Sequence, residues 1–332
     1  MRKITMKDIA EMAKVSKTTV SMVLNNKETN ISEETKNRVL EIANKYNYIP
    51  NSIARSLSTK KTNTIGIILP DITNPFFSEI ARAIEDGAGS LGYNVIFCNT
   101  DNEEEKEKGY TQLLISKLVD GVIFISGGEG YQSIKVLKDN NVPFVVVDRH
   151  IELEEEHYGV YVLNKEGIRK GMEYLYNKGK KKIAFVKGPY GLKTSEERFL
   201  GYKECMDVKG FYDEDLVAQG DFTIEGGIKA TEEILNRNEN VDAIFYSNDI
   251  MACAGIKYLI KKGIRIPEDI SVMGFDNITL SSFFEPELTT LAQPIYLMGR
   301  ESCKMLIDLI LENPIDKNQI YFETELIIRE TV

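Results

Sequence analysis

The chain has 332 residues, of which 42% are hydrophobic, so it can bury a substantial core and form two or three units of ordinary domain size. Its formal net charge of −10 argues against a nucleic-acid partner unless the charge is unevenly spread. No apolar run reaches the roughly 18 to 20 residues that cross a bilayer, and the N-terminus turns polar before a signal-peptide core could form. We therefore expect a cytoplasmic protein with no membrane partner.

The four cysteines stand far apart in the sequence and form no Cys-x-x-Cys pair. They are Cys98, Cys205, Cys253 and Cys303. Only two histidines, His150 and His157, could join them as metal ligands. We expect reduced thiols that mostly serve as packing groups, with no metal site and no cofactor.

The charge is unevenly distributed along the chain. Residues 1–61 carry twelve Lys and Arg against six Asp and Glu, a net of +6, so the remaining residues carry −16. A basic end on an acidic body lets a protein dock on phosphates in one orientation. The alternative is a chance excess of lysine in a Lys-rich chain.

A first short helix is predicted from Met6 to Ala13. Thr5 can cap it, because Asp8 follows three residues later and completes a capping pair. Ile9, Met12 and Ala13 give this helix one apolar face.

A second helix begins after Ser16, which can cap it. Val20, Val23 and Leu24 point to one side of the helix. The opposite face is polar and slim, and it carries Lys17, Thr18, Ser21, Met22 and Asn25.

A third helix follows an Asn-containing linker. Ser32 can cap it, and Glu33 and Glu34 suit the positive end of its dipole. Its predicted buried stripe is Val39, Ile42, Ala43 and Tyr46. Two short helices joined by a tight turn and braced by a third have the geometry that inserts a recognition helix into the DNA major groove. A three-helix module that binds another protein is the alternative.

Pro50 ends this helical unit because it restricts Ile49 to extended geometry. Residues 51–58 could then form only about two helical turns, which should fray in isolation. A solvated linker is the alternative. If the segment orders only on DNA, it can be a linker in the free protein and a helix in the complex.

These motifs resemble the head of the lac repressor family. The matching runs are Met6-Lys7-Asp8-Ile9-Ala10, Val15-Ser16-Lys17-Thr18-Thr19-Val20-Ser21, Asn25, and Asn47-Tyr48-Ile49-Pro50-Asn51. The resemblance extends along the whole chain. It implies a helix-turn-helix DNA-binding domain over residues 1–50, a hinge helix and linker over 51–61, and an effector-binding and dimerisation core over 62–332.

The resemblance also assigns roles within this segment. It implies that Lys17, Thr18 and Met22 face base edges, and that paired hinge helices enter the minor groove, where Leu57 wedges between base steps. Met22 departs from the polar or basic residue of many relatives. Methionine can contact a thymine methyl but cannot donate a hydrogen bond to guanine. The DNA-binding candidates are Thr5, Ser16, Lys17, Thr18, Ser21, Met22, Asn25, Tyr48, Asn51, Ala54, Arg55 and Leu57.

From residue 64 the pattern changes to short apolar strands that alternate with helix-length segments, such as 75–91. Strands are predicted at 64–69, 94–98, 121–125 and 144–147, and a second set at 182–186, 242–246 and 271–274. This is βαβ patterning, and it predicts an α/β core of two doubly wound lobes beside the small all-α head. Ligands of such sheets bind beyond the carboxyl ends of the strands, so we expect a cleft between the lobes.

Polar and aromatic residues follow these predicted strand ends. Carboxylate, amide and guanidinium groups can hold sugar hydroxyls, while aromatic rings cover the apolar face of a sugar. Any one of these residues could instead be a helix cap or part of a loop ion pair. The effector-binding candidates are Asp71, Asn74, Phe76, Phe77, Asp148, Arg149, Arg198, Phe222, Asn248, Asp276 and Gln293.

Apart from Asp71, this set resembles the pocket of the ribose-binding periplasmic proteins, whose fold the repressor cores share. The resemblance implies ribose or a similar monosaccharide more than a purine. One departure is Leu163-Asn164, where relatives often carry Asp-Asn; it alters either the pocket edge or only the local turn.

We therefore expect a homodimeric, sequence-specific DNA-binding repressor whose partners are double-stranded operator DNA and a sugar-like effector. A catabolite-control regulator of the same fold, whose main partner is a phosphorylated carrier protein, is the main alternative. A secreted sugar receptor would lack the first sixty residues. An enzyme is disfavoured because Gly127-Gly128-Glu129-Gly130 lacks the remaining glycine of a dinucleotide loop and no Ser/His/Asp set is evident.

Overall fold

The computed structural model describes residues 4–25, 30–49, 61–125, 131–150, 156–238 and 240–332. The predicted hinge at 51–58, the glycine-rich turn at 127–130 and most of the acidic stretch at 152–156 lie outside these residues. Contacts divide the chain into two units, Met1–Thr62 and Asn63–Val332. Within the described ranges, no helix is long and apolar enough to cross a membrane.

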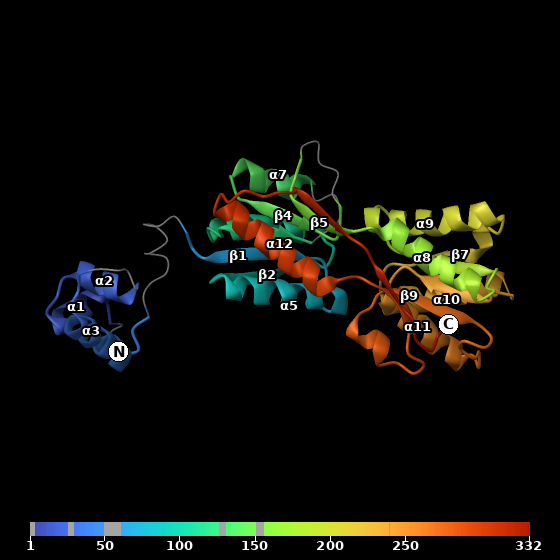
Figure 1. Cartoon of the computed structure of the whole chain (residues 1–332), viewed down its shortest axis with the longest axis horizontal. Helices are drawn as coiled ribbons and strands as arrows, with labels where there is room; N and C mark the ends of the chain where they lie inside the picture. Colours follow the sequence, from blue (N-terminus) through green and yellow to red (C-terminus); the bar gives the residue numbers. More distant parts are fainter. Residues whose placement is uncertain (1–3, 26–29, 50–60, 126–130, 151–155, 239) are drawn as a thin grey trace. The chain divides into compact units, whose positions relative to one another are not determined.

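The first unit contains the three predicted helices (Figure 1), which are α1 (Met6–Ala13), α2 (Lys17–Leu24) and α3 (Glu33–Lys45). Thr5, Ser16 and Ser32 cap them as predicted, and Thr5 forms a reciprocal capping box with Asp8. The helices enclose a small core made of Ile9, Ala10, Ala13, Val20, Val23, Val39 and Ala43.

Two residues predicted to lie in this core are instead exposed. Met12 is 39% exposed because Ala10, rather than Met12, completes the buried stripe of α1. Tyr46 is 43% exposed because α3 ends at Lys45 and the chain turns back through Asn47, whose φ is +47°. The backbone N–H of Tyr48 then bonds to the Ala43 carbonyl at 2.9 Å, and Tyr48 packs against the core in place of Tyr46.

The second unit has two lobes, each built on one six-stranded sheet, so the predicted fold class is confirmed. The first sheet is entirely parallel, with the order β11-β5-β4-β3-β1-β2. Its strands are β1 (Thr64–Leu69), β2 (Asn94–Asn99), β3 (Gly121–Phe124), β4 (Phe144–Val147), β5 (Gly159–Val162) and β11 (Gln319–Phe322).

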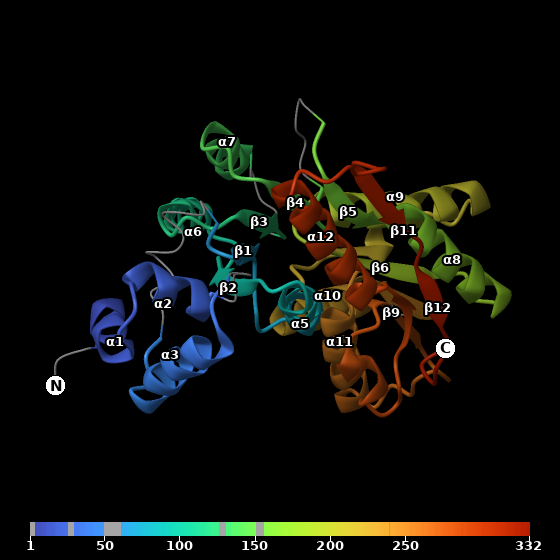
Figure 2. The same ribbon diagram turned by 60° about the vertical axis from the view of Figure 1, so that its left-hand side comes forward.

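Helices cover both faces of this first sheet, which is why its central strands are continuously apolar. One face carries α5 (Pro75–Ser90) and α12 (Ile295–Ile310), which pack along each other. The other carries α6 (Glu104–Ser116) and α7 (Tyr131–Asp139). Figure 2 shows α12, in red, against the first sheet although it follows the second lobe in sequence.

The second sheet has the order β12-β10-β9-β8-β6-β7, with β12 antiparallel to β10. Its strands are β6 (Ile183–Lys187), β7 (Val217–Gln219), β8 (Ala243–Tyr246), β9 (Ser271–Asp276), β10 (Thr289–Ala292) and β12 (Glu325–Ile327). Its helices are α8 (Asn164–Asn177), α9 (Lys193–Lys209), α10 (Ile224–Arg237) and α11 (Asp249–Lys261), with short 3-10 turns η1 (Glu214–Leu216) and η2 (Thr279–Ser282).

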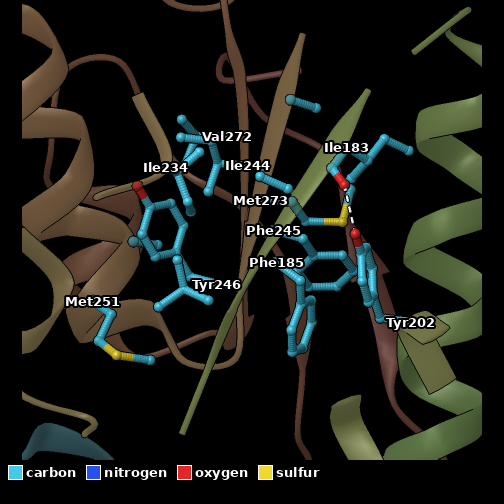
Figure 3. Close-up of a cluster of buried hydrophobic side chains, with 14 of the residues drawn as sticks. Ile183, Phe185, Tyr202, Ile234, Ile244, Phe245, Tyr246, Met251, Val272 and Met273 are labelled. Carbon is cyan, nitrogen blue, oxygen red and sulfur yellow. Dashed lines mark hydrogen bonds between the residues drawn. The ribbon is translucent and has the colours of Figure 1, made fainter. Parts of the chain in front are cut away.

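Aromatic side chains fill the core of the second lobe (Figure 3). Tyr202 stacks on Phe185 with ring centroids 4.8 Å apart, and Phe245 meets Phe185 edge-on at 5.8 Å. The Tyr202 hydroxyl donates to the Ile183 carbonyl at 2.8 Å, so its polar atom is satisfied inside the core.

The chain crosses between the two sheets three times, at residue 163, at residues 293–294 and at residues 323–324. Gln293 therefore lies in a crossover between the lobes, as predicted. All four cysteines are free thiols, and all but Cys205 are buried.

Candidate functional site

A cavity of about 280 Å³, including space open to solvent, lies where the two lobes face each other. The structure brings ten of the eleven predicted effector-binding residues to its wall and adds Thr194. The lining is Asn74, Phe76, Phe77, Asp148, Arg149, Thr194, Arg198, Phe222, Asn248, Asp276 and Gln293.

The first lobe supplies an aromatic corner and a cation. Asn74 caps α5 by accepting a hydrogen bond from the Phe76 N–H at 3.1 Å, and the Phe76 and Phe77 rings meet edge to face at 5.1 Å. The Arg149 guanidinium lies 5.2 Å from the centre of the Phe77 ring. Its Nη1 donates to Asn102 Oδ1 at 2.9 Å, which orients the guanidinium from outside the cavity.

Asp148 follows β4 in a left-handed conformation, with φ of +64°. Its side chain is buried, and Oδ1 has no hydrogen-bond partner among the described residues. Burial raises the pKa of Asp148, and the positive charges of Arg198 and Arg149 oppose that shift. A buried acceptor without a partner is costly, so Asp148 favours a ligand that brings a hydroxyl donor.

The second lobe holds Arg198 in a buried position on α9. Its guanidinium lies 3.8 Å from the centre of the Phe275 ring and 5.9 Å from that of Phe222. Nη1 donates to the Ser247 carbonyl at 2.7 Å and lies 3.8 Å from Asp276 Oδ1.

Asp276 is the last residue of β9, and its φ of +126° turns the chain sharply toward the cavity. Gln293 Nε2 donates to Asp276 Oδ1 at 2.7 Å, whereas Gln293 Oε1 is buried without a partner among the described residues. Burial raises the pKa of Asp276 well above its usual range, and the charge of Arg198 opposes this. Gln293 Oε1 is thus a second unpartnered acceptor, in addition to Asp148 Oδ1.

Phe222 closes the wall of the second lobe. Its φ is +67°, and its carbonyl accepts a hydrogen bond from Asn248 Nδ2 at 3.4 Å. Asn248 also caps α11, because its Oδ1 accepts from the Met251 N–H at 3.0 Å. The Phe222 ring occupies space that a side chain at Gly188 would fill, since a Cβ there would lie 2.3 Å from the ring.

Asp71 does not line the cavity. Its Oδ1 instead accepts from the N–H and the hydroxyl of Thr73, at 2.9 and 2.7 Å, and so shapes the turn before α5. Sequence reasoning missed Thr194, which is buried and lies one helical turn before Arg198 on α9. That i, i+4 spacing on one helix face was a usable signal.

The predicted recognition face lies on α2. Lys17 and Thr18 are exposed, whereas Ser21, Met22 and Asn25 are half-buried. Ser16 also caps α2, and Asn25 Nδ2 donates to the Ser21 carbonyl at 2.7 Å. Tyr48 is half-buried against the core. Thr5 is exposed and caps α1. The other four candidates, Asn51, Ala54, Arg55 and Leu57, lie outside the described residues.

Residues 62–329 match the family described as "Periplasmic binding proteins and sugar binding domain of LacI family". Residues 5–51 match "Bacterial regulatory proteins, lacI family". The chain belongs to the lac repressor family. It is a transcription regulator with a DNA-binding head and a core of the sugar-binding type, and its relatives are regulators rather than enzymes.

Two relatives match nearly the whole chain. The ribose operon repressor of Halalkalibacterium halodurans is 41% identical over 98% of this chain and 96% of the relative. Catabolite control protein A of Priestia megaterium is 34% identical over 99% of both.

Two solved structures share the fold and part of the sequence. The lac repressor dimer bound to operator and the anti-inducer ONPF is 28% identical, with a TM-score of 0.89 over 99% of both chains. A LacI-family regulator from Enterococcus faecium with bound ribose is 31% identical, with a TM-score of 0.73 over 81% of this chain and 98% of that one.

Proposed function

We propose that this protein is a repressor that releases its operator when ribose or a similar monosaccharide binds in the cavity between the lobes. In this proposal residues 1–50 read the DNA, residues 51–61 form the hinge helix and linker, and residues 62–332 bind effector and form a homodimer. The observation that carries it is the convergence of two arginines, two aspartates and unpartnered acceptor atoms on one cavity.

The charges of the cavity favour an uncharged ligand. Arg149 and Arg198 bring two positive charges, and their attraction favours the ionised forms of Asp148 and Asp276 against the burial that raises both pKa values. With both carboxylates ionised, these four side chains carry no net charge. A phosphorylated or acidic sugar would add negative charge beside the two carboxylates, and burying unbalanced charge is costly. A neutral polyol brings hydroxyl groups that both accept from arginine and donate to carboxylate oxygens.

The chemistry of the wall supports a single sugar ring. Phe76, Phe77 and Phe222 supply aromatic surface for the apolar face of a ring. The similarity to a ribose operon repressor and to a regulator with bound ribose favours ribose among monosaccharides.

The DNA-binding part of the proposal rests on the exposed face of α2. Lys17 and Thr18 are available at the start of the helix, where side chains of a recognition helix meet base edges. Two such heads in a homodimer would read a near-palindromic operator. The alternative partner, a phosphorylated carrier protein, has no support in the described residues, and we do not propose it.

Calorimetry with ribose, paired with operator binding, tests the proposal. Arg149→Ala and Arg198→Ala should each lower ribose affinity by tenfold to a hundredfold or more, because a lost charge-assisted hydrogen bond costs about 1.5 to 3 kcal/mol. Both variants should bind operator nearly as the wild type does when no sugar is present, and should no longer respond to ribose. Arg82→Ala is the matched control, since Arg82 lies on the surface of α5 and pairs with Asp86.

A wild type that binds no monosaccharide would refute the proposed effector class, and unchanged ribose affinity in both variants would refute the proposed site. A thermal-shift screen of pentoses, hexoses, sugar phosphates and purines then identifies the ligand, because a ligand at a hundred times its Kd adds about 2.7 kcal/mol of stability.

A further inference from the structure

Asn164 lies directly after the first of the three crossovers between the sheets. β5 of the first sheet ends at Val162, and Asn164 is the first residue of α8, which belongs to the second lobe. The side chain of Asn164 is 3% exposed, and it is not part of the cavity wall. Since Asn164 does not line the cavity, any effect on a ligand must pass through the residues to which its amide is hydrogen-bonded.

The amide of Asn164 holds Arg198. Arg198 Nε donates to Asn164 Oδ1 at 2.8 Å, and Nη1 donates to the Ser247 carbonyl at 2.7 Å. The guanidinium group is planar and rigid, so fixing Nε and Nη1 also fixes the direction of Nη2. No described residue accepts a hydrogen bond from Nη2, which leaves it as the group that can meet a ligand.

The orientation of the Asn164 amide is itself determined. Its Nδ2 donates to the Val162 carbonyl at 3.4 Å and to Glu197 Oε2 at 3.3 Å, and both partners are acceptors. The amide oxygen must therefore point toward Arg198, whose Nε is a donor only. Arg198 is bound to the first crossover through Asn164 and reaches the second through Asp276 and Gln293.

We propose that Asn164 is a positioning residue for effector binding: it aims Nη2 of Arg198 into the cavity and fixes the guanidinium to the segment that joins the lobes. This inference rests on the proposed function of the cavity. Neither residue of the Leu163-Asn164 pair lines the cavity, and Asn164 acts through Arg198.

The test measures Asn164→Ala in the full-length protein, using D-ribose as the probe. Removing the acceptor for Nε of Arg198 should lower ribose affinity by about tenfold. Asn177→Ala, at the exposed far end of the same helix, is the control and should bind ribose as the wild type does. If Asn164→Ala does not fold, Asn164→Ser replaces it, since serine can serve the Val162 carbonyl but is too short to reach Arg198.

A double-mutant cycle separates positioning from a merely structural role. In an Arg198→Met background, which has no donor for Asn164 Oδ1, Asn164→Ala should cause no further loss of ribose affinity. An equal loss in both backgrounds, or unchanged affinity of Asn164→Ala alone, would overturn the inference. If the wild type does not bind ribose, the effector assignment fails separately, and the same cycle is measured with whichever sugar phosphate or purine shifts the wild-type Tm.

Discussion

Glu79 on α5 of the first lobe accepts two hydrogen bonds from Thr279 of the second lobe, one from its backbone N–H at 3.0 Å and one from its hydroxyl at 2.9 Å. The residues on either side of Thr279, Ile278 and Leu280, pack against the apolar cluster of the first lobe. The loop that follows Asp276 therefore contacts the first lobe within a few residues of the cavity.

We expect Glu79→Ala to lower ribose affinity by roughly two- to tenfold, because solvent weakens the hydrogen bonds to this exposed carboxylate to about 0.5 to 1.5 kcal/mol and because the arrangement of the two lobes seen here would be less populated without them. Calorimetry measures the effect. Glu85→Ala on the same helix is the control, since Glu85 forms its ion pair with Arg82. Equal affinities of wild type and Glu79→Ala would show that this contact does not contribute to effector binding.

Gly188→Ala should weaken effector binding by about tenfold or more, because the new Cβ would lie 2.3 Å from the Phe222 ring and force it out of place. Gly89→Ala is the control, as a Cβ there meets nothing within 4 Å. Isothermal calorimetry compares the two. If Gly188→Ala binds ribose as tightly as Gly89→Ala does, Phe222 is not a necessary part of the wall.

The buried carboxyl of Asp249 should make stability depend on pH. Burial raises its pKa from 3.8 to about 6, although Thr290 and the Ile278 N–H donate to it. Between these values the folded protein keeps a proton that the unfolded chain has released, so the free energy of unfolding falls as pH rises. Urea unfolding of Asp249→Asn should show a smaller fall than the wild type, because the raised pKa values of the buried Asp148 and Asp276 also contribute to it. Asp207→Asn, at an exposed ion pair with Lys203, should keep the full fall.

A difference between Asp249→Asn and wild type that stays constant from about pH 4 to about pH 7 would contradict this assignment.

Lys17→Ala and Thr18→Ala should each change the order of preference among operator sequences, by about 1 to 3 kcal/mol for a good base contact. A binding assay against an operator library measures this. Lys7→Ala, on the exposed surface of α1 beside Glu11, can remove only a phosphate contact and should leave the order unchanged. The two α2 residues are excluded from the recognition face if their variants rank the library as the wild type does.

Leu57→Ala should weaken binding to operator much more than binding to random duplex, because a wedge helps only where the DNA can kink. Titrations of both duplexes at matched salt give the comparison. An equal loss on the two duplexes would count against the wedge, since phosphate contacts alone carry no sequence preference.

The long elements were predictable from the sequence because their patterns are strong. Each helix of the head begins after a capping residue, which is Thr5, Ser16 or Ser32. The apolar runs of β1 and β4 indicate buried strands. Most of the missed strands contain polar residues, such as Gln219 in β7 and Glu325 in β12, whereas β4, with only four residues, is wholly apolar. Such segments are held by their neighbours in the sheet, which the local sequence does not record.

The cavity was predictable where residues follow strand ends, and less so where they do not. Asp71 occupies such a position, but Thr73 is close enough in sequence to take its carboxylate. Asn164 follows β5, a strand that was not predicted, and it is explained only by its contact with Arg198, 34 residues away. Thr194 lies in the helix after the predicted strand at 182–186, one turn before Arg198.

The return of α12 and β11 to the first lobe sets the order in which the protein can form during synthesis. The head has its whole core within residues 9–43, so it can fold while the ribosome is still making the rest. Neither sheet of the core can close its edge until residues 319–327 have emerged. A DNA-binding head can therefore form on the nascent chain before the part that is proposed to sense sugar, and the core is completed only when residues 319–327 have been made.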